Sequence, residues 1–365
     1  MLYVNGRFLT QPISGVQRYA WELLGALDDL LEAQPGALGP VEVLVPRAVT
    51  PPAWKALRLR IVPGGRGHGW EQVTLARAAW DGVLLSLGNS GPLAHPRHVL
   101  CLHDAHIYEM PQAFSPRYRL WHRALRPALA RRAAALITVS DHSAQQLGTH
   151  LKLDPARFNI VPNSAEHVLR LPAAPGAPRH YGLTPGGYLL SVGNQSPNKN
   201  LAALALAHAA AGSDTLPLAI VGGDVPGIAQ ARPERSGLHL LGRVPDADLR
   251  GLYEGAAGFV FPSLHEGFGI PPLEAMQLGV PVLCARSGAM PEVLGDAPIW
   301  FSARDPADIN RALRAFAGLS AGDRAAMVAR GRKVAARYTW RGSAAKMLQI
   351  LERLLNEMPP AAQVA

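Results

Sequence analysis

The stretch Phe261–Cys284, FPSLHEGFGIPPLEAMQLGVPVLC, determines the fold class. A buried strand is predicted to end near Ser263, and a glycine-containing turn follows it. Pro271 or Pro272 then opens a helix, because the fixed φ of proline suits the first helical position. A second apolar strand, VPVLC, comes after the helix. The stretch therefore predicts a parallel α/β unit, in which the free N–H groups of the turn and helix start can bind a diphosphate.

Two carboxylates flank this turn, with seven residues between them. We expect Glu274 in the first helical turn, where it can stabilise the helix dipole or accept hydrogen bonds from two neighbouring hydroxyls of a ribose. Glu266 is expected on the loop, within reach of a sugar. The alternative is that Glu274 only caps the helix and that Glu266 only faces solvent.

Strand-like and helix-like segments alternate on both sides of this stretch, which predicts two doubly wound parallel sheets with helices on both faces. The proline-rich segment 169–187, LRLPAAPGAPRHYGLTPGG, suits neither helix nor strand. We therefore expect Rossmann-like domains at residues 1–170 and 171–339, facing a central cleft, with a last helix at about 340–358 packing on the first domain.

Composition limits the possible functions. The chain has 365 residues, 48% of them hydrophobic, and no apolar run of the roughly 18 residues that a membrane span needs. The start has no signal-peptide pattern, so we expect a cytoplasmic protein. The net charge of +9 requires tolerance of an anionic partner: nucleic acid, a phosphorylated metabolite or an acidic membrane. Because neither G-x-G-x-x-G nor G-x-x-x-x-G-K-[ST] is present, hydride transfer and P-loop chemistry are disfavoured.

The string His265–Met276, HEGFGIPPLEAM, resembles the E-x7-E signature of the retaining GT-B glycosyltransferases called group 1. The resemblance extends across most of the chain and implies a nucleotide diphosphate sugar as donor. It implies that Glu266 contacts the transferred sugar and that Glu274 contacts the donor ribose. The backbone expected near the sugar and diphosphate belongs to Gly267, Phe268, Gly269 and Ile270.

Further segments of the second half resemble the same family. In 191–201, SVGNQSPNKNL, the resemblance assigns Lys199 to the leaving diphosphate, against the alternative of a surface lysine. Asn194 is a donor-binding candidate near the place where many relatives have an arginine. Arg243 and Val244 correspond to the turn that reads the nucleobase. We expect Asp246 at the N-cap of the next helix rather than in a D-x-D metal motif, so neither a metal nor another cofactor is expected.

The first half carries weaker signals. In TQPISGVQRYAWELL, the amides of Gly15 and Val16 are expected near the donor phosphates. His103 follows a buried strand, where relatives place a histidine against the donor sugar; the alternative is a histidine that only satisfies the strand end. The segment 115–136 carries six arginines around aromatic residues, which predicts either contact with an anionic membrane or a solvated helix.

The segments YVNGRFLTQPISGVQRYAWEL, GNSGPL and HDAHIYEMP together resemble bacterial mannosyl- and related hexosyltransferases of surface-polysaccharide assembly. That resemblance implies transfer of mannose from GDP-mannose to a lipid-diphosphate-linked or oligosaccharide acceptor in O-antigen, capsule or exopolysaccharide synthesis. It also implies peripheral action at the inner face of the plasma membrane. One rival is a nucleotide-sugar 2-epimerase-like GT-B enzyme. The other is a basic nucleic-acid-binding protein, for which no basic and aromatic module is present.

Overall fold

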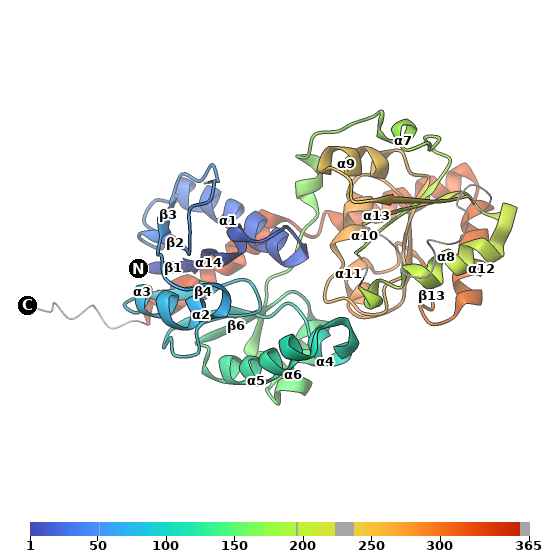
Figure 1. Cartoon of the computed structure of the whole chain (residues 1–365). Coiled ribbons are helices and arrows are strands. Elements are labelled where there is room, and N and C mark those ends of the chain that lie inside the picture. The colour runs from blue at the N-terminus through green and yellow to red at the C-terminus, as the bar shows by residue number, and fades with distance from the viewer. Residues whose placement is uncertain (51, 195, 223–236, 358–365) are drawn as a thin grey trace, which may run out of the picture. The chain divides into compact units, whose positions relative to one another are not determined.

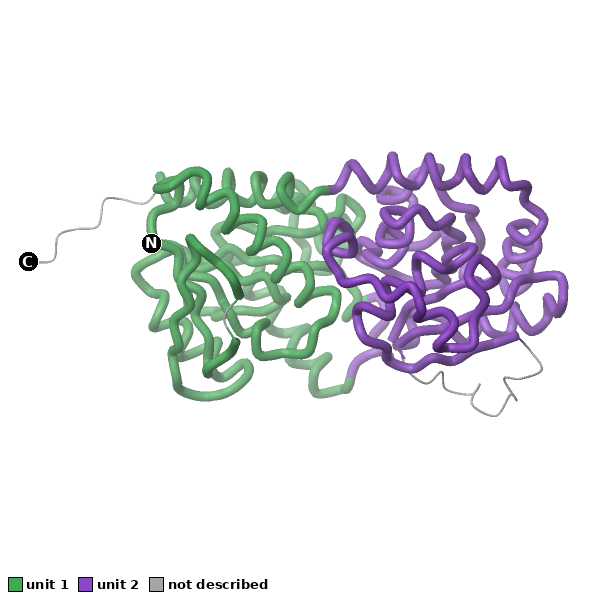
Figure 2. Tube along the Cα trace, turned by 90° about the horizontal axis from the view of Figure 1, so that it is seen from above, with its two compact units in different colours: residues 1–108, 115–163, 339–365 green, residues 109–114, 164–338 purple. Residues whose placement is uncertain are grey.

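The apolar runs of the sequence form two parallel sheets in the computed structural model, which describes residues 1–50, 52–194, 196–222 and 237–357 (Figure 1). The chain divides into two units (Figure 2). Unit 1 contains residues 1–108, 115–163 and the segment from 339 onward, and unit 2 contains 109–114 and 164–338. The sequence places the division at 170/171, whereas residues 164–170 belong to unit 2.

The sheet of unit 1 has the strand order β3-β2-β1-β4-β5-β6-β7, and all its pairs are parallel. Its strands are β1 Leu2–Asn5, β2 Val41–Val45, β3 Leu57–Ile61, β4 Val83–Ser86, β5 His98–Cys101, β6 Ala135–Thr138 and β7 Phe158–Ile160. Strands β1, β4 and β5 are buried at every position, as expected for a parallel sheet covered on both faces. The strand order reverses between β1 and β4, which makes their carboxyl ends the switch point of unit 1.

The helices of unit 1 are α1 Gly15–Ala33, α2 Gly67–Gly69, a π-helix Trp70–Leu75, α3 Ala76–Ala78, α4 His106–Glu109, α5 Pro116–Arg132, α6 Asp141–Leu151 and α14 Trp340–Asn356; the last residue of α4 is assigned to unit 2. Helix α14 begins after Thr339, whose Oγ1 accepts a hydrogen bond from the Gly342 N–H at 3.0 Å. It packs against α1, so the last helix belongs to the first sheet. Met358, the end of the predicted helix, lies outside the described residues.

The sheet of unit 2 repeats the arrangement, with the order β10-β9-β8-β11-β12-β13 and parallel pairing throughout. Its strands are β8 Leu189–Val192, β9 Leu218–Val221, β10 Leu238–Gly242, β11 Gly258–Phe261, β12 Val282–Ala285 and β13 Ile299–Phe301. The switch point of unit 2 is formed by the carboxyl ends of β8 and β11. The predicted fold class of two doubly wound, Rossmann-like domains is confirmed.

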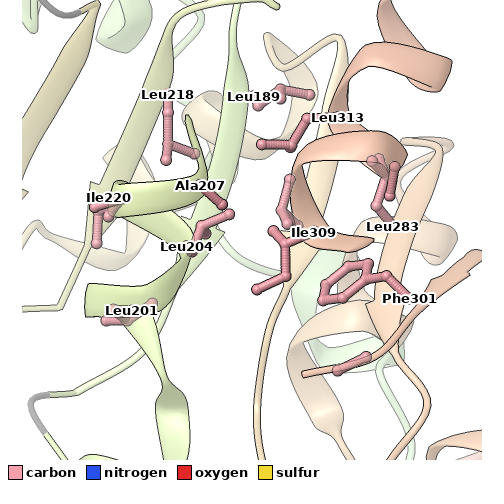
Figure 3. Packing of buried hydrophobic residues seen from close by; sticks show 14 of the residues in the cluster. Leu189, Leu201, Leu204, Ala207, Leu218, Ile220, Leu283, Phe301, Ile309 and Leu313 are labelled. Atoms are coloured by element: carbon pink, nitrogen blue, oxygen red, sulfur yellow. The ribbon is translucent and has the colours of Figure 1, made fainter. Parts of the chain in front are cut away.

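The helices of unit 2 are α7 Ala177–His180, α8 Leu201–Ala211, α9 Asp246–Glu254, α10 Ile270–Gln277, α11 Met290–Leu294, α12 Pro306–Ala317 and α13 Ala321–Ala335. Helices α8 and α12 pack together over the sheet (Figure 3). Leu204 of α8 and Ile309 of α12 are both fully buried there. Among the described helices, none is both long and apolar enough to cross a membrane.

Candidate active site

The switch point of unit 2 brings two predicted site residues into contact. Lys199 ends a 3-10 helix, Pro197–Lys199, that follows β8, and Glu266 lies on the loop that follows β11. The Lys199 Nζ donates to Oε1 of Glu266 at 2.6 Å. The two side chains are 18% and 15% exposed, so the pair is shielded from most of the solvent but remains accessible. Sequence reasoning selected both residues but assigned them to different parts of a ligand.

Backbone hydrogen bonds hold the two loops that carry this pair. The Leu264 N–H donates to the Asn198 carbonyl at 2.7 Å. The Asn200 amide donates to the Pro262 carbonyl at 3.2 Å and to the Ala303 carbonyl at 2.8 Å. These bonds fix the position of the Lys199 backbone relative to the strand end of β11. The ammonium position is therefore set by the fold rather than by the flexible side chain alone.

Close backbone packing also holds Glu266. Its carbonyl accepts a hydrogen bond from the Ala289 N–H at 3.0 Å. Gly288, with φ +55°, passes so close that a Cβ there would collide with the Glu266 backbone. Sequence reasoning missed Gly288, for which the only signal was a Ser-Gly pair after an apolar run. The positive φ and the contact both require glycine.

Helix α10 starts differently from the prediction. Gly269 precedes it with φ +85°, and Ile270 is the first helical residue, so neither Pro271 nor Pro272 holds the first position. The positive φ explains why glycine stands there, since the atoms nearest to a Cβ belong to the end of the flexible Met290 side chain, which can move aside. Glu274 consequently lies in the second turn and does not cap the helix. Pro271 and Pro272 have no N–H, so the start of α10 offers a phosphate the Ile270 amide and the positive end of the helix dipole rather than a row of amides.

The Glu274 carboxylate is held by two donors instead. The His167 Nε2 lies 2.9 Å from Oε1, and the Tyr253 hydroxyl donates to Oε2 at 2.9 Å. Burial, followed by the negative charge of Glu274, raises the pKa of Tyr253 well above its ordinary value, so the phenol stays a donor. No local signal pointed to His167, which lies 107 residues away from Glu274 in the chain.

The other candidates of unit 2 lie on neighbouring strand ends. Asn194 follows β8, and its side-chain oxygen accepts from the Ser196 N–H at 3.2 Å. Arg243 is exposed and follows β10 together with Val244, which is partly buried. Asp246 is the first residue of α9 rather than its N-cap, which is Pro245. Within the described part of the chain, no group of three His, Cys, Asp or Glu residues is placed to hold a metal ion.

In unit 1, His103 follows β5 and is buried. Its Nε2 donates to the Leu87 carbonyl at 2.8 Å, which leaves Nδ1 without the proton in the neutral ring. Burial lowers the pKa of His103, so the ring is neutral near pH 7. Tyr19 of α1 packs edge-on against it with ring centroids 4.8 Å apart. Gly15 and Val16 are the first two residues of α1, the helix that also carries Tyr19. Helix α1 therefore carries two of the first-half candidates and contacts the third, His103.

The basic segment on α5 is less uniform than predicted. Arg126 is only 3% exposed, and its Nη1 donates to the Asp104 carbonyl at 3.3 Å. Burial tends to raise the pKa of Asp104, but the charges of Arg126 and His106 outweigh it and hold that pKa low. Arg126 therefore stabilises a buried carboxylate and does not belong to a solvated basic face. Tyr118 and Trp121, by contrast, are exposed by 41% and 44%.

Comparison with known proteins agrees with this geometry. The family described as "Glycosyl transferases group 1" matches residues 186–317. O-antigen chain mannosyltransferase B of Escherichia coli is 35% identical over 262 residues, which cover 67% of this chain and 67% of the relative. Identity over this length shows membership of a family, and the matched segment contains both residues of the Lys199–Glu266 pair.

Two solved structures show the same fold at low identity. Sucrose-phosphate synthase from Thermosynechococcus elongatus superposes with a TM-score of 0.71 at 16% identity, covering 98% of this chain and 99% of that chain. Anabaena Alr3699/HepE in complex with UDP-glucose gives a TM-score of 0.69 at 16% identity, with the same coverage. The chain therefore belongs to the group 1 glycosyltransferases and has a GT-B fold.

Proposed function

We propose that this glycosyltransferase transfers a hexose, with mannose from GDP-mannose as the leading donor, onto a lipid-linked or oligosaccharide acceptor. The proposed pathway class is the assembly of O-antigen, capsule or exopolysaccharide, supported by the name of the Escherichia coli relative. The observation that carries the proposal is the Lys199–Glu266 pair at the switch point of unit 2. The pair supports the proposal because it brings a cation and a carboxylate together on the two loops that precede α8 and α10.

The proposed reaction retains the anomeric configuration. The acceptor oxygen forms a bond to the anomeric carbon on the face from which the diphosphate leaves, and the bond from that carbon to the phosphate oxygen breaks. The proton of the acceptor hydroxyl passes to the departing phosphate. Lys199 and the positive end of the α10 dipole stabilise the charge that develops on the leaving group, so the proposal includes no metal ion and no cofactor.

Lys199 and Glu266 form an ion pair with each other, so we propose that this pair must separate when the donor binds. The donor diphosphate would replace Glu266 as the anionic partner of Lys199. Glu266 would then be released to accept hydrogen bonds from the sugar. In this proposal, nucleotide binding is itself the event that makes the sugar-positioning carboxylate available.

The remaining roles are proposed residue by residue. Glu274 binds the ribose hydroxyls with the orientation that His167 and Tyr253 give it. The proposed base-reading and phosphate contacts are made by Arg243, Val244 and Asn194, by the amides of Gly15 and Val16, and by the backbone of Gly267, Phe268, Gly269 and Ile270. His103 is proposed to contact the donor sugar through its ring.

Thermal unfolding with GDP, UDP and ADP, each alone and as its sugar, tests the donor first, because a ligand that binds the folded state raises the unfolding temperature. GDP and GDP-mannose should give the largest shifts, and a response to UDP alone would exclude GDP-mannose. Transfer of labelled mannose to an oligosaccharide acceptor, with the product anomer assigned by NMR, tests retention. Unchanged rates in EDTA are expected. Sugar conversion without acceptor would indicate the epimerase-like reaction instead.

As part of the same proposal we place the reaction in the cytoplasm, where nucleotide sugars are the available donors. Helix α5 could also bring the chain to the inner face of the membrane, through the same exposed aromatic side chains that the next subsection assigns to a sugar. Fractionation of cells that express the tagged chain tests the location. Recovery outside the cytoplasmic and membrane fractions would contradict it.

A further inference from the structure

The switch point of unit 1 carries a second polar cluster that the proposed donor roles leave unused. Asn5 ends β1 and Ser86 ends β4. The Asn5 amide donates to Glu71 at 2.9 Å and to the Ser86 hydroxyl at 3.4 Å. Doubly wound sheets bind ligands at this topological position. Glu71 lies in the π-helix Trp70–Leu75, a conformation that often marks a functional site.

Glu71 is only 1% exposed and serves as the centre of the cluster. Besides Asn5, it accepts hydrogen bonds from the Ser90 hydroxyl at 3.0 and 3.1 Å and pairs with the Arg7 Nε at 3.1 Å. The Asn5 and Arg7 contacts are made to Oε1 of Glu71, and the His68 Nδ1 lies 2.8 Å from Oε2. The carboxylate is therefore fully engaged and fixes the side chains around it. Since Nδ1 faces the carboxylate, His68 presents its other ring nitrogen away from this bond.

His122 of α5 lies against this cluster with unused hydrogen-bonding capacity. Its ring centroid is 5.2 Å from that of His68 and 4.1 Å from that of Tyr118. Neither ring nitrogen has a partner among the described residues, although the residue is only 2% exposed. Burial, with the charges of Arg126 and His68, lowers the pKa of His122 to about 3. The neutral ring therefore offers one donor and one acceptor, the combination that pairs with a hydroxyl.

Exposed aromatic rings border the two histidines. Trp121 and Tyr118 are 44% and 41% exposed, and the indole centroid lies 5.8 Å from the His68 ring. Flat aromatic surface beside hydrogen-bonding groups suits a sugar ring, whose C–H faces pack on the indole while its hydroxyls pair with the imidazoles. The Tyr118 ring packs on His122, so a ligand that pairs with the His122 nitrogens has to displace the phenol.

The charge balance of the cluster favours an uncharged ligand. Arg7 is paired with Glu71, and Arg126 stabilises the ionised carboxylate of Asp104. Each of these two guanidiniums therefore already faces a carboxylate as its counter-charge. We propose that Tyr118, Trp121, His122 and His68 form a subsite for an uncharged hexose residue of the acceptor glycan. This inference rests on the proposed function, because it names which part of the acceptor the first unit recognises.

Binding of an α-linked mannotriose to the full-length chain, without nucleotide, tests the subsite. Saturation-transfer NMR and calorimetry would be applied to the wild type, to Trp121→Ala and to the control Trp80→Ala, which removes a 55% exposed indole outside the cluster. We expect Trp121→Ala to weaken binding about tenfold, and Trp80→Ala to leave it within about twofold. His68→Ala, at a side chain that is 30% exposed, provides a second variant with an expected loss of about fivefold.

Three results would overturn the subsite. The first is that mannotriose shows no saturation transfer with the wild type. The second is that Trp121→Ala and Trp80→Ala bind it equally. The third is that Trp121→Ala loses co-sedimentation with phosphatidylglycerol vesicles but keeps its mannotriose affinity, which would assign the surface to a membrane. An unchanged unfolding temperature, and an unchanged response to GDP, shows that each variant is folded.

Donor and acceptor experiments separate this inference from the proposed function. If mannotriose binding depends on Trp121 but GDP-mannose is not consumed, the donor assignment fails and the subsite stands. If mannose is transferred and Trp121→Ala leaves the acceptor KM unchanged, the function stands and the subsite fails. Both proposals are supported if Trp121→Ala raises the KM for the acceptor and leaves the KM for the donor unchanged.

Discussion

The six-stranded sheet of unit 2 repeats the order of the first six strands of unit 1, but the two switch points differ in how the carboxylate is held. In unit 2, Glu266 has one ion-pair partner, Lys199, and its side chain is 15% exposed. In unit 1, Glu71 is 1% exposed and is bound by four side chains. A carboxylate with one accessible partner can exchange it for a ligand. A carboxylate that is fully bonded and buried can only position its neighbours.

Replacing Glu266 by alanine should have the largest effect on catalysis. We expect mannose transfer to fall about 1000-fold, since a group that positions the reacting sugar is lost. GDP affinity should stay within a few fold or increase slightly, because Lys199 loses its competing partner. Initial rates and calorimetry measure the two effects, with Glu254→Ala on α9 as the control. An equal loss of transfer and of GDP binding would show that Glu266 does not act on the sugar.

Replacing Glu71 by glutamine should destabilise the fold rather than remove a single contact with a ligand. The Arg7 guanidinium would lose its counter-charge, and we expect the free energy of unfolding at pH 7 to fall by about 3 kcal/mol. Urea unfolding measures this, and the exposed Glu32→Gln should change it by less than about 0.5 kcal/mol. A small effect at Glu71 would mean that the cluster is held together by other contacts.

The pH dependence of the same variant has a defined sign. Burial tends to raise the pKa of Glu71, but the His68 hydrogen bond and the Arg7 charge outweigh it and lower that pKa. The folded state therefore favours the ionised form, and its stabilisation is present above the ordinary glutamate pKa. It is lost as the pH falls through the lowered pKa. The stability difference between wild type and Glu71→Gln should accordingly shrink in acid, and a difference that grows would contradict this assignment.

Replacing Lys199 by alanine should weaken GDP binding about 100-fold, because the diphosphate loses its cation and Glu266 is left unpaired. Lys333→Ala, on α13, removes a lysine of the same unit outside the switch point and should bind GDP normally. Titration at two salt concentrations adds a second measurement, since screening should weaken the wild type more than the variant. Equal affinities for wild type and Lys199→Ala would place the diphosphate elsewhere.

Replacing Tyr253 by phenylalanine should have the smallest effect of the series. The Glu274 carboxylate keeps His167 and loses one hydrogen bond, so we expect the donor KM to rise roughly tenfold with kcat within about twofold. Tyr181→Phe removes a comparable hydroxyl–carboxylate bond, to Asp248, and is the matched control. A change in kcat alone would argue that Tyr253 acts on the chemical step.

Much of the fold was predictable because a strand in a parallel sheet is a continuous apolar run. Strands β7 and β13 were not predicted, since FNI and IWF are only three residues long and FNI contains a polar residue. The start of α10 was predicted at a proline. The left-handed conformation of Gly269, with φ +85°, sets the start one residue before Pro271.

The candidate site was predictable where chemistry is local in sequence. Lys199 and Glu266 follow strand ends in segments with recognisable spacing, and both lie at the switch point of unit 2. Their mutual ion pair was not predicted, because the sequence alone does not show which side chains meet across 67 positions. The same holds for His167 beside Glu274 and for the cluster around Glu71. Such contacts depend on the order of strands rather than on spacing.

The packing of α14 on α1 has a consequence for synthesis of the chain. The ribosome produces residues 164–338, the main body of unit 2, before it reaches the helix that covers α1. Until then the face of α1 that packs on α14 lacks its cover. Unit 1 is therefore begun first and finished last. A nascent chain stalled before residue 340 would expose this surface to chaperones, although the second sheet is already complete.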